Sequence, residues 1–365
     1  MQHIQTDITD ENLVLTFSVA RIPFLNFNQK KKLLKNLDSP QSLALLYIED
    51  IFNILQCDKV SKACWNGPEN LRMARAEAYQ CQRLGIKLLM HCDEAYPELL
   101  RQIADPPFVL FVRGDEKLLS GRCVSVVGTR RLTQTGREAA KSFACDASMD
   151  GCNIVSGLAY GADACAHQGA LNAYYNWCET GGTITDSVGY SEAFEPCEPG
   201  RTIAVLPCAI DEIVPYSNKR LAAQILQSGG CLVSEYAPGT PTQKRNFVAR
   251  NRIIAGLSEA TVVIEAPVGS GALITADFAL EDTRDLFFHE ATFGEAAERV
   301  SSTVKSGLEK DFAAGRISKY KMENSSERFL KDGAPVIKDY KDFCVALTEM
   351  PGERNAVPLQ GELFT

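Results

Sequence analysis

The segment QKRNFVARNRIIAG gathers the side chains best suited to chemistry, because cations and an aromatic ring crowd together in it. Lys244, Arg245, Arg250 and Arg252 fall within nine consecutive positions of a chain whose net charge is -8. Lys244 and Phe247 are three positions apart at the expected start of a helix, so their side chains point to one side. Cations suit a nucleic-acid backbone and an aromatic ring suits its bases, so the segment indicates a single-stranded nucleic-acid site. Phe247 would equally suit the hydrophobic core.

Two turns that follow β-branched runs have the design of anion sites. In SVVGTRRLTQTG, Gly128, Thr129 and Arg130 stand between an expected buried strand and a helix, whose free N–H groups attract phosphate. A plain tight turn with a surface arginine would have the same sequence. In IVSGLAYGADACAH, Ser156 and Gly157 occupy the corresponding place. Neither turn is a dinucleotide fingerprint, and the chain contains no P-loop.

Asp163 and His167 lie four positions apart on one expected helical face, which is a spacing that permits acid–base chemistry. No GxSxG nucleophile elbow accompanies them, so we favour a structural role in which they hydrogen-bond each other and a nearby loop. A further turn, EAPVGSGALIT, offers Ser270, Gly271 and Thr275 for another anion contact or for tight packing. We therefore predict no catalytic residue, no metal site and no bound cofactor.

These turns belong to a regular alternation of strands and helices. The runs CVSVV, NIVS, TIAVL, CLVSE and TVVIE are separated by helical segments, which predicts a parallel sheet covered on both faces. Ligands of such folds bind beyond the carboxyl ends of the strands. Before this region, apolar residues recur at helical spacing over residues 11–56, and a third helix is expected near residues 68–84. The fold class is therefore α/β, with a small all-helical region in front.

We place a small helical domain at residues 1–84 and the sheet domain at residues 85–348. Two stretches, near residues 173–201 and 293–318, are too long for ordinary connections and are interpreted as insertions, the second of them helical. We expect residues 349–365 to form a flexible tail.

Length and composition narrow the class of protein. The chain has 365 residues, of which 45% are apolar, and no apolar run approaches the roughly eighteen residues of a membrane-spanning helix. No export signal is visible, so we expect a cytoplasmic protein. The 13 cysteines show no CxxC spacing, which favours reduced thiols over disulfides. The negative net charge argues against a largely basic surface that binds nucleic acid nonspecifically, but it is compatible with a local basic patch.

Several stretches together resemble the DNA-processing protein A family, also called DprA or Smf. They span most of residues 96–345 and are YPELLRQIADPPFVLFVRGD, VVGTRRLTQTG, IVSGLAYGADACAHQGAL, TIAVLPCAIDEIVPYSN, SEYAPGTPTQKRNFVARNRIIAGLSEATVVIEAPVGSGALITADFAL and ENSSERFLKDGAPVIKDYKDF. The resemblance implies an extended Rossmann-like domain that binds single-stranded DNA, dimerises and helps load RecA recombinase in natural transformation and homologous recombination. It implies no catalytic activity. The helical region resembles the sterile-alpha-motif-like (SAM-like) domain of that family.

The resemblance also implies which residues form the DNA pocket. These are Gly128, Thr129, Arg130, Ser156, Gly157, Lys244 and Phe247, to which we add Arg250 from the same basic segment. The insertion after residue 173 stands where the family connects quickly to its next strand, so it would cover or reshape the pocket.

Two other functions compete with DNA binding. One is a nucleotide-phosphate hydrolase of the lysine-decarboxylase-like (phosphoribohydrolase) type, whose PGGxGTxxE signature is absent from this chain. The other is a structural oligomer whose turns bind nothing.

Gln360, Leu363 and Phe364 in QGELF resemble the short peptide by which bacterial DNA-maintenance proteins dock onto the replication sliding clamp. Leu363 and Phe364 would enter an apolar groove while Gln360 bonds at its rim. Chance alone would place such a pattern in roughly one chain of this length in twenty.

Overall fold

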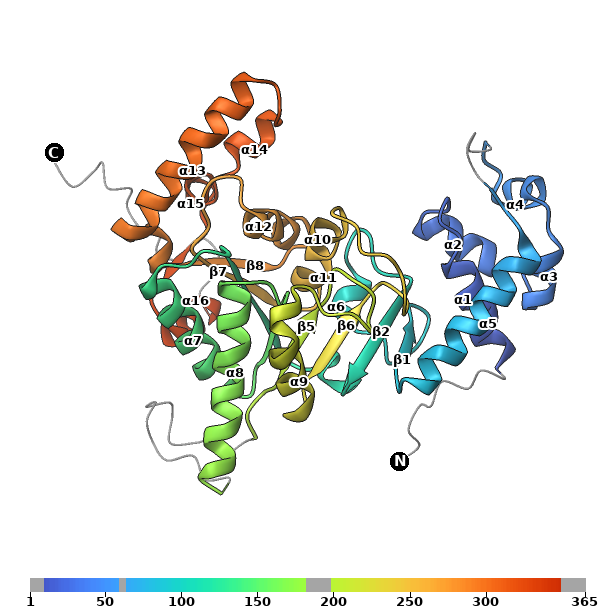
Figure 1. Cartoon of the computed structure of the whole chain (residues 1–365), viewed down its shortest axis with the longest axis horizontal. Coiled ribbons are helices and arrows are strands. Elements are labelled where there is room, and N and C mark those ends of the chain that lie inside the picture. Colours follow the sequence, from blue (N-terminus) through green and yellow to red (C-terminus); the bar gives the residue numbers. More distant parts are fainter. Residues whose placement is uncertain (1–9, 59–63, 182–197, 349–365) are drawn as a thin grey trace.

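The computed structural model describes residues 10–58, 64–181 and 198–348. Five helices come first: α1 (Glu11–Ala20), α2 (Phe27–Leu34), α3 (Pro40–Leu45), α4 (Ile48–Leu55) and α5 (Gly67–Arg83). Asp10 caps α1, and Asn26 and Gln29 form a reciprocal capping box on α2, which fixes where these helices begin. Their apolar faces enclose a separate small core around Leu15, Val19, Leu33 and Ile51. The helices gather beyond one edge of the sheet (Figure 1).

The rest of the described chain is built around a nine-stranded sheet with the strand order β1-β2-β6-β5-β4-β3-β7-β8-β9. The strands are β1 (Lys87–Met90), β2 (Val109–Gly114), β3 (Cys123–Gly128), β4 (Asn153–Ser156), β5 (Thr202–Val205), β6 (Cys231–Ser234), β7 (Ala260–Ile264), β8 (Asp285–His289) and β9 (Val336–Ile337). All neighbouring strands from β6 to β9 are parallel, which confirms the expected α/β, Rossmann-like class.

The sheet also has an antiparallel edge. The strand β2 pairs antiparallel with both β1 and β6. Sequence analysis did not separate β2 from its surroundings, because VLFV lies between proline and glycine turns. The strands β8 and β9 were missed as well, the second because it is only two residues long.

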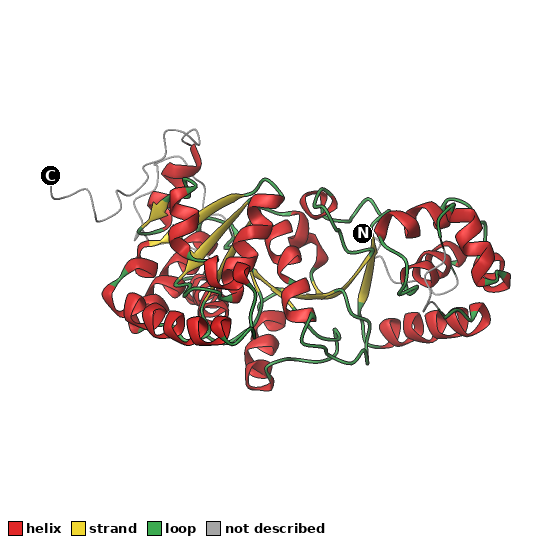
Figure 2. Ribbon diagram, turned by 90° about the horizontal axis from the view of Figure 1, so that it is seen from above, coloured by secondary structure: helices red, strands yellow, loops and turns green. Residues whose placement is uncertain are grey.

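Helices cover both faces of the sheet (Figure 2). One face packs against α6 (Glu98–Arg101), α11 (Asn251–Gly256), α12 (Gly271–Glu281) and α15 (Ser326–Lys331). The other packs against α7 (Gln134–Met149), α8 (Ala162–Glu179), α9 (Lys219–Gln227), α16 (Tyr340–Thr348) and part of α5. Side chains alternate across β3, since Val124 and Val126 enter one core and Val127 the other.

The remaining elements are short or lie outside these layers. They are α10 (Asn246–Ala249), α13 (Glu295–Ala313), α14 (Lys319–Glu323) and the 3₁₀ turns η1 (Glu116–Ser120), η2 (Tyr216–Asn218) and η3 (Glu290–Phe293). The helix α13 occupies most of the second stretch interpreted as an insertion. Residues 182–197 of the first stretch, the tail from residue 349 and its QGELF motif lie outside the described residues.

The order of the strands determines where a ligand crevice forms. From β3 the chain proceeds through β4, β5 and β6 on one side, then crosses to β7, β8 and β9 on the other. Connections on the two sides of β3 therefore leave in opposite directions, and a crevice opens beyond the carboxyl ends of β3 and β7. Within the described ranges, no helix is long and apolar enough to cross a membrane, and the twelve cysteines there are free thiols.

Candidate nucleic-acid interface

A crevice of about 370 Å³ lies beyond the carboxyl ends of β3, β4 and β7. Gly128, Thr129 and Arg130 line it from the turn after β3, and Phe247 and Arg250 line it from α10 and the residue that follows. The start of α12, including Ser270, Gly271 and Thr275, forms another wall, and residues of α8 and α11 complete the lining. The topology thus brings together turns that sequence analysis had considered separately.

The turn after β3 is held by Glu265, which follows β7 and is buried. The backbone N–H of Thr129 donates to the carbonyl of Glu265 at 2.7 Å, and the N–H of Thr133 donates to its carboxylate at 2.9 Å. The hydroxyl of Thr133 donates to the other carboxylate oxygen and also caps α7. Glu265 therefore holds both ends of the turn, one through its backbone carbonyl and the other through its carboxylate, and Arg130 lies between these two fixed points.

Arg130 and Phe247 meet at the mouth of the crevice. The guanidinium carbon of Arg130 lies 5.7 Å from the centroid of the Phe247 ring, within the range of a cation–π contact. Arg130 is exposed and Phe247 is half-buried, so a ligand can reach both. Sequence analysis left open whether Phe247 belongs to the core, and the structure places it at the crevice.

Ser156, Gly157 and Arg250 lie beneath this mouth. The hydroxyl of Ser156 is fully buried and donates to the carbonyl of Val126 at 2.6 Å. Arg250 is only 5% exposed, and its Nη1 donates to the carbonyl of Val205 at 2.9 Å. A Cβ on Gly157 would lie 1.5 Å from that nitrogen, so only glycine leaves room for the guanidinium. Arg250 therefore lines the floor of the crevice, whereas Ser156 and Gly157 lie behind it and do not line it.

Asp163 and His167 are also buried, and of the two only Asp163 lines the crevice. The carboxylate of Asp163 accepts the N–H groups of Gly157 at 3.1 Å and of Ala159 at 3.2 Å, which holds the turn after β4. Burial raises the pKa of Asp163, while the charge of Arg250 opposes that rise. Nδ1 of His167 is 2.6 Å from the hydroxyl of Thr202, so this histidine bonds a strand rather than Asp163.

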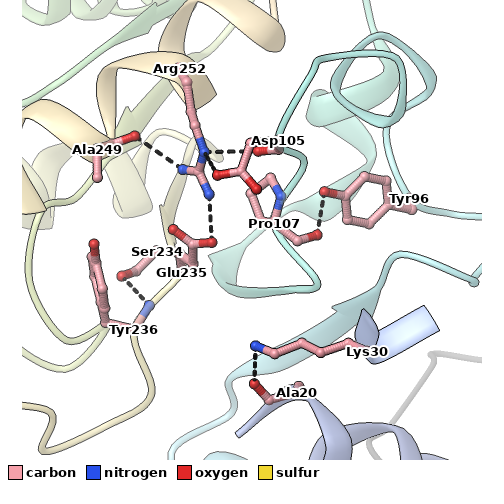
Figure 3. Close-up of polar contacts among 10 residues, drawn as sticks. All are labelled: Ala20, Lys30, Tyr96, Asp105, Pro107, Ser234, Glu235, Tyr236, Ala249 and Arg252. Atoms are coloured by element: carbon pink, nitrogen blue, oxygen red, sulfur yellow. Dashed lines mark hydrogen bonds and ion pairs between the residues drawn. The ribbon is translucent and has the colours of Figure 1, made fainter. Parts of the chain in front are cut away.

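The basic segment is divided by the fold. Lys244 and Arg245 are exposed in the turn before α10, but neither lines the crevice. Arg252 is 8% exposed and lies between two carboxylates, with Nε 3.2 Å from Asp105 and Nη2 2.6 Å from Glu235 (Figure 3). The four cations of this segment therefore do not form one exposed patch, because acidic partners distant in sequence neutralise Arg252 and burial encloses Arg250.

Two groups at the site were missed. Arg131 is exposed, lines the crevice and follows Arg130, so the dipeptide RR already signalled it. Asn251 donates to the carbonyl of Gly271 at 3.1 Å and thereby joins α11 to the start of α12. The two helices pack side by side (Figure 1). A sequence offers no signal for Asn251, because its partner belongs to another turn.

Comparison with known proteins gives consistent results. The family model described as DNA recombination-mediator protein A matches residues 87–348. Protein Smf from Borreliella burgdorferi is 30% identical over 285 residues, which cover 77% of this chain and 81% of that protein. DNA processing protein DprA from Bacillus subtilis is 37% identical over 204 residues, which cover 56% of this chain and 60% of that one.

A solved structure shares the fold over nearly the whole chain. DNA processing protein A from Streptococcus pneumoniae superimposes with a TM-score of 0.61 at 25% sequence identity. The match covers 94% of this chain and 98% of that one. The similarity therefore includes the N-terminal helices as well as the sheet.

The buried histidine behind the crevice makes stability depend on pH. Burial, with the nearby charge of Arg250, lowers the pKa of His167 to about 3. In the unfolded chain it takes up a proton near pH 6.5. As pH falls from about 6.5 towards 3, only the unfolded state gains this proton, so His167 should remove about 1.4 kcal/mol of stability per pH unit. Above pH 6.5 it should have no effect.

Urea unfolding of the parent and of His167→Asn between pH 7.5 and 4.5 measures this term. The asparagine keeps a polar atom near Thr202 but does not titrate in this range, so its stability should fall less steeply below about pH 6.5. Parallel curves for the two proteins would contradict the assignment.

Proposed function

This chain belongs to the DNA recombination-mediator protein A family, and from that premise we propose that it binds single-stranded DNA in the crevice beyond β3 and β7. The observation that carries the proposal is the cation–π pair of Arg130 and Phe247 at the mouth of the crevice. A single strand offers both a phosphate for the guanidinium and an unpaired base for the ring. A duplex hides its bases in the stack, so it cannot use the ring.

The residues around the crevice divide into three roles. Arg130 and Arg131 supply exposed cations for phosphates at the crevice, and Lys244 supplies a further exposed cation outside its lining, three residues before Phe247. Gly128 and Thr129 bring the backbone of the first turn close to the bound DNA. Phe247 supplies the stacking surface. Arg250 forms the floor, and the buried residues Ser156 and Gly157 support it from behind. Arg250 also places a positive charge beneath the crevice, where low polarity strengthens its field.

This function requires no catalysis, and we propose that the protein is not an enzyme. The hydrolase alternative would need an exposed acid–base pair. Asp163 and His167 are both buried, and each is engaged with a backbone or hydroxyl group of a neighbouring strand or turn. No observation among the described residues therefore favours hydrolysis of a nucleotide phosphate.

We further propose, as the family resemblance implies, that the protein forms a homodimer in the cytoplasm and helps load RecA recombinase in natural transformation and homologous recombination. RecA-catalysed strand exchange should accelerate when the protein is added to single-stranded DNA precoated with single-strand-binding protein. Analytical ultracentrifugation of the same preparation measures the dimer. An unchanged rate of strand exchange would contradict the proposed RecA loading without contradicting the proposed DNA binding.

The cations of the site should determine how binding responds to salt. Arg130→Ala combined with Lys244→Ala removes two proposed phosphate contacts, each worth about 0.7 in the slope of log affinity against log salt for a single strand. The slope should therefore become shallower by about 1.4. Fluorescence anisotropy with a labelled oligothymidylate at several salt concentrations measures it.

Arg72→Ala combined with Arg75→Ala is the matched control. It removes the same charge from exposed positions on α5, far from the crevice (Figure 1). An equal decrease of the slope in both double variants would mean that the crevice is not the binding site.

The ring of Phe247 should contribute to binding rather than to folding. Phe247→Ala should weaken binding of single-stranded DNA by about 1 to 3 kcal/mol, because a stacked base loses its partner. Phe247→Tyr should restore most of it, and Phe312→Ala, on an exposed ring of α13, should have no effect. Thermal melting accompanies each titration. If Phe247 belonged to the core, Phe247→Ala would instead lower the stability of the protein by about 3 to 5 kcal/mol, and that outcome would contradict the stacking role.

A further inference from the structure

We propose that the DNA-binding track continues along the carboxyl edge of the sheet, away from the crevice, to a second stacking platform formed by Tyr160 and Tyr216. A further unpaired base of the same strand would stack there, with its phosphate at Lys219. This inference rests on the proposed function, because it extends the same strand of DNA.

Tyr160 lies directly beside the turn that carries Arg130. It follows β4 and is 50% exposed. The next residue, Gly161, has a φ of +76°, and a Cβ there would lie 2.2 Å from the carbonyl oxygen of Thr129 and 2.8 Å from Cα of Arg130. The N–H of Ala162 donates to the same Thr129 carbonyl at 3.1 Å. The turn after β4 therefore packs backbone to backbone against the turn after β3.

Tyr216 lies one strand further from β3 than Tyr160, along the same edge of the sheet. It belongs to η2, between β5 and α9, and is 77% exposed. The hydroxyl of Ser217 donates to the phenol oxygen of Tyr160 at 3.0 Å. Nδ2 of Asn218 donates to the carbonyls of Leu158 at 2.8 Å and Ala159 at 3.3 Å. The two tyrosines thus stand on turns that are bonded to each other.

The platform carries its own cations. Nζ of Lys219 lies 5.5 Å from the centroid of the Tyr216 ring, and Arg220 is exposed next to it. The preceding acids are engaged elsewhere, since Asp211 accepts the N–H of Gly239 and Glu212 accepts the hydroxyl of Thr242. The pairing of a cation with an aromatic ring repeats the one that Arg130 and Phe247 form at the crevice.

The contacts form one continuous series along the ends of neighbouring strands. Phe247 contacts Arg130, the turn of Arg130 packs against that of Tyr160, and Tyr160 bonds the turn of Tyr216. The helices that begin beyond the two tyrosine-bearing turns, α8 and α9, lie side by side (Figure 1). Tyr160 and Tyr216 are half or more exposed, so a large part of each apolar ring lies in water, and stacking with a base would bury that surface. Because every base has a flat face, the platform should accept any sequence.

The test is a titration of oligothymidylates of increasing length with the full chain, its variants Tyr160→Ala and Tyr216→Ala, and the double variant. For a long strand the double variant should lose affinity about 5- to 150-fold, as expected when stacking of a base is lost. The loss should be smaller for a strand of only a few nucleotides, which the crevice alone can hold. Tyr216→Phe should bind like the parent, because stacking needs the ring and not the hydroxyl.

Tyr79→Ala is the matched control. Tyr79 on α5 is 52% exposed and carries Arg83 at 6.0 Å over its ring, so it reproduces the tyrosine–cation pair away from the sheet edge. Its loss should leave binding unchanged. If the tyrosine variants bind strands of every length like the parent while Arg130→Ala binds weakly, the platform is refuted and the crevice stands. If the parent binds no single strand at all, the proposed function itself fails.

Discussion

The buried guanidinium of Arg250 is the constraint around which the crevice is built. Burying a charge without compensation costs several kcal/mol, so its surroundings must supply partners and space. Val205 supplies a carbonyl acceptor from the end of β5, Asp163 supplies an opposing charge from α8, and Gly157 supplies the space after β4. The carboxylate of Asp163 in turn holds the amide groups of the turn after β4. One cation thereby fixes the ends of two strands and the segment that carries Phe247.

Glu265 plays the complementary role on the other side of β3. It is a buried anion at the end of β7, and its acceptors are satisfied by the turn that presents Arg130. A buried cation and a buried anion, each bonded to neighbouring turns, therefore flank the central strand. These bonds fix the backbone segments that carry Arg130 and Phe247, which reduces the entropy that a ligand would have to pay to order them.

The fold was more predictable from the sequence than the site. Parallel strands buried on both faces read as β-branched runs, which is why β3 to β7 were recognised, whereas β2 was hidden among proline and glycine turns. At the candidate site, the sequence singled out Arg130 and Phe247 separately, but their contact depends on topology. The exposure of each cation in the basic segment was not predictable. It depends on Asp105, Glu235 and Val205, whose proximity only the folded chain creates.

The net charge of -8 does not exclude a DNA site in this chain, because dissolved salt screens electrostatic interactions between distant exposed charges. At physiological ionic strength the field of an exposed charge decays over about 8 Å, so acids on distant surfaces scarcely act at the crevice. The charges that matter are those near its mouth. Arg130 and Arg131 are exposed there, Arg250 lies in the less polar floor, and the carboxylates of Asp163 and Glu265 are turned towards backbone amides. The net negative charge of the rest of the chain would then discourage nonspecific contact with duplex DNA, while the proposed site would keep its local positive charge.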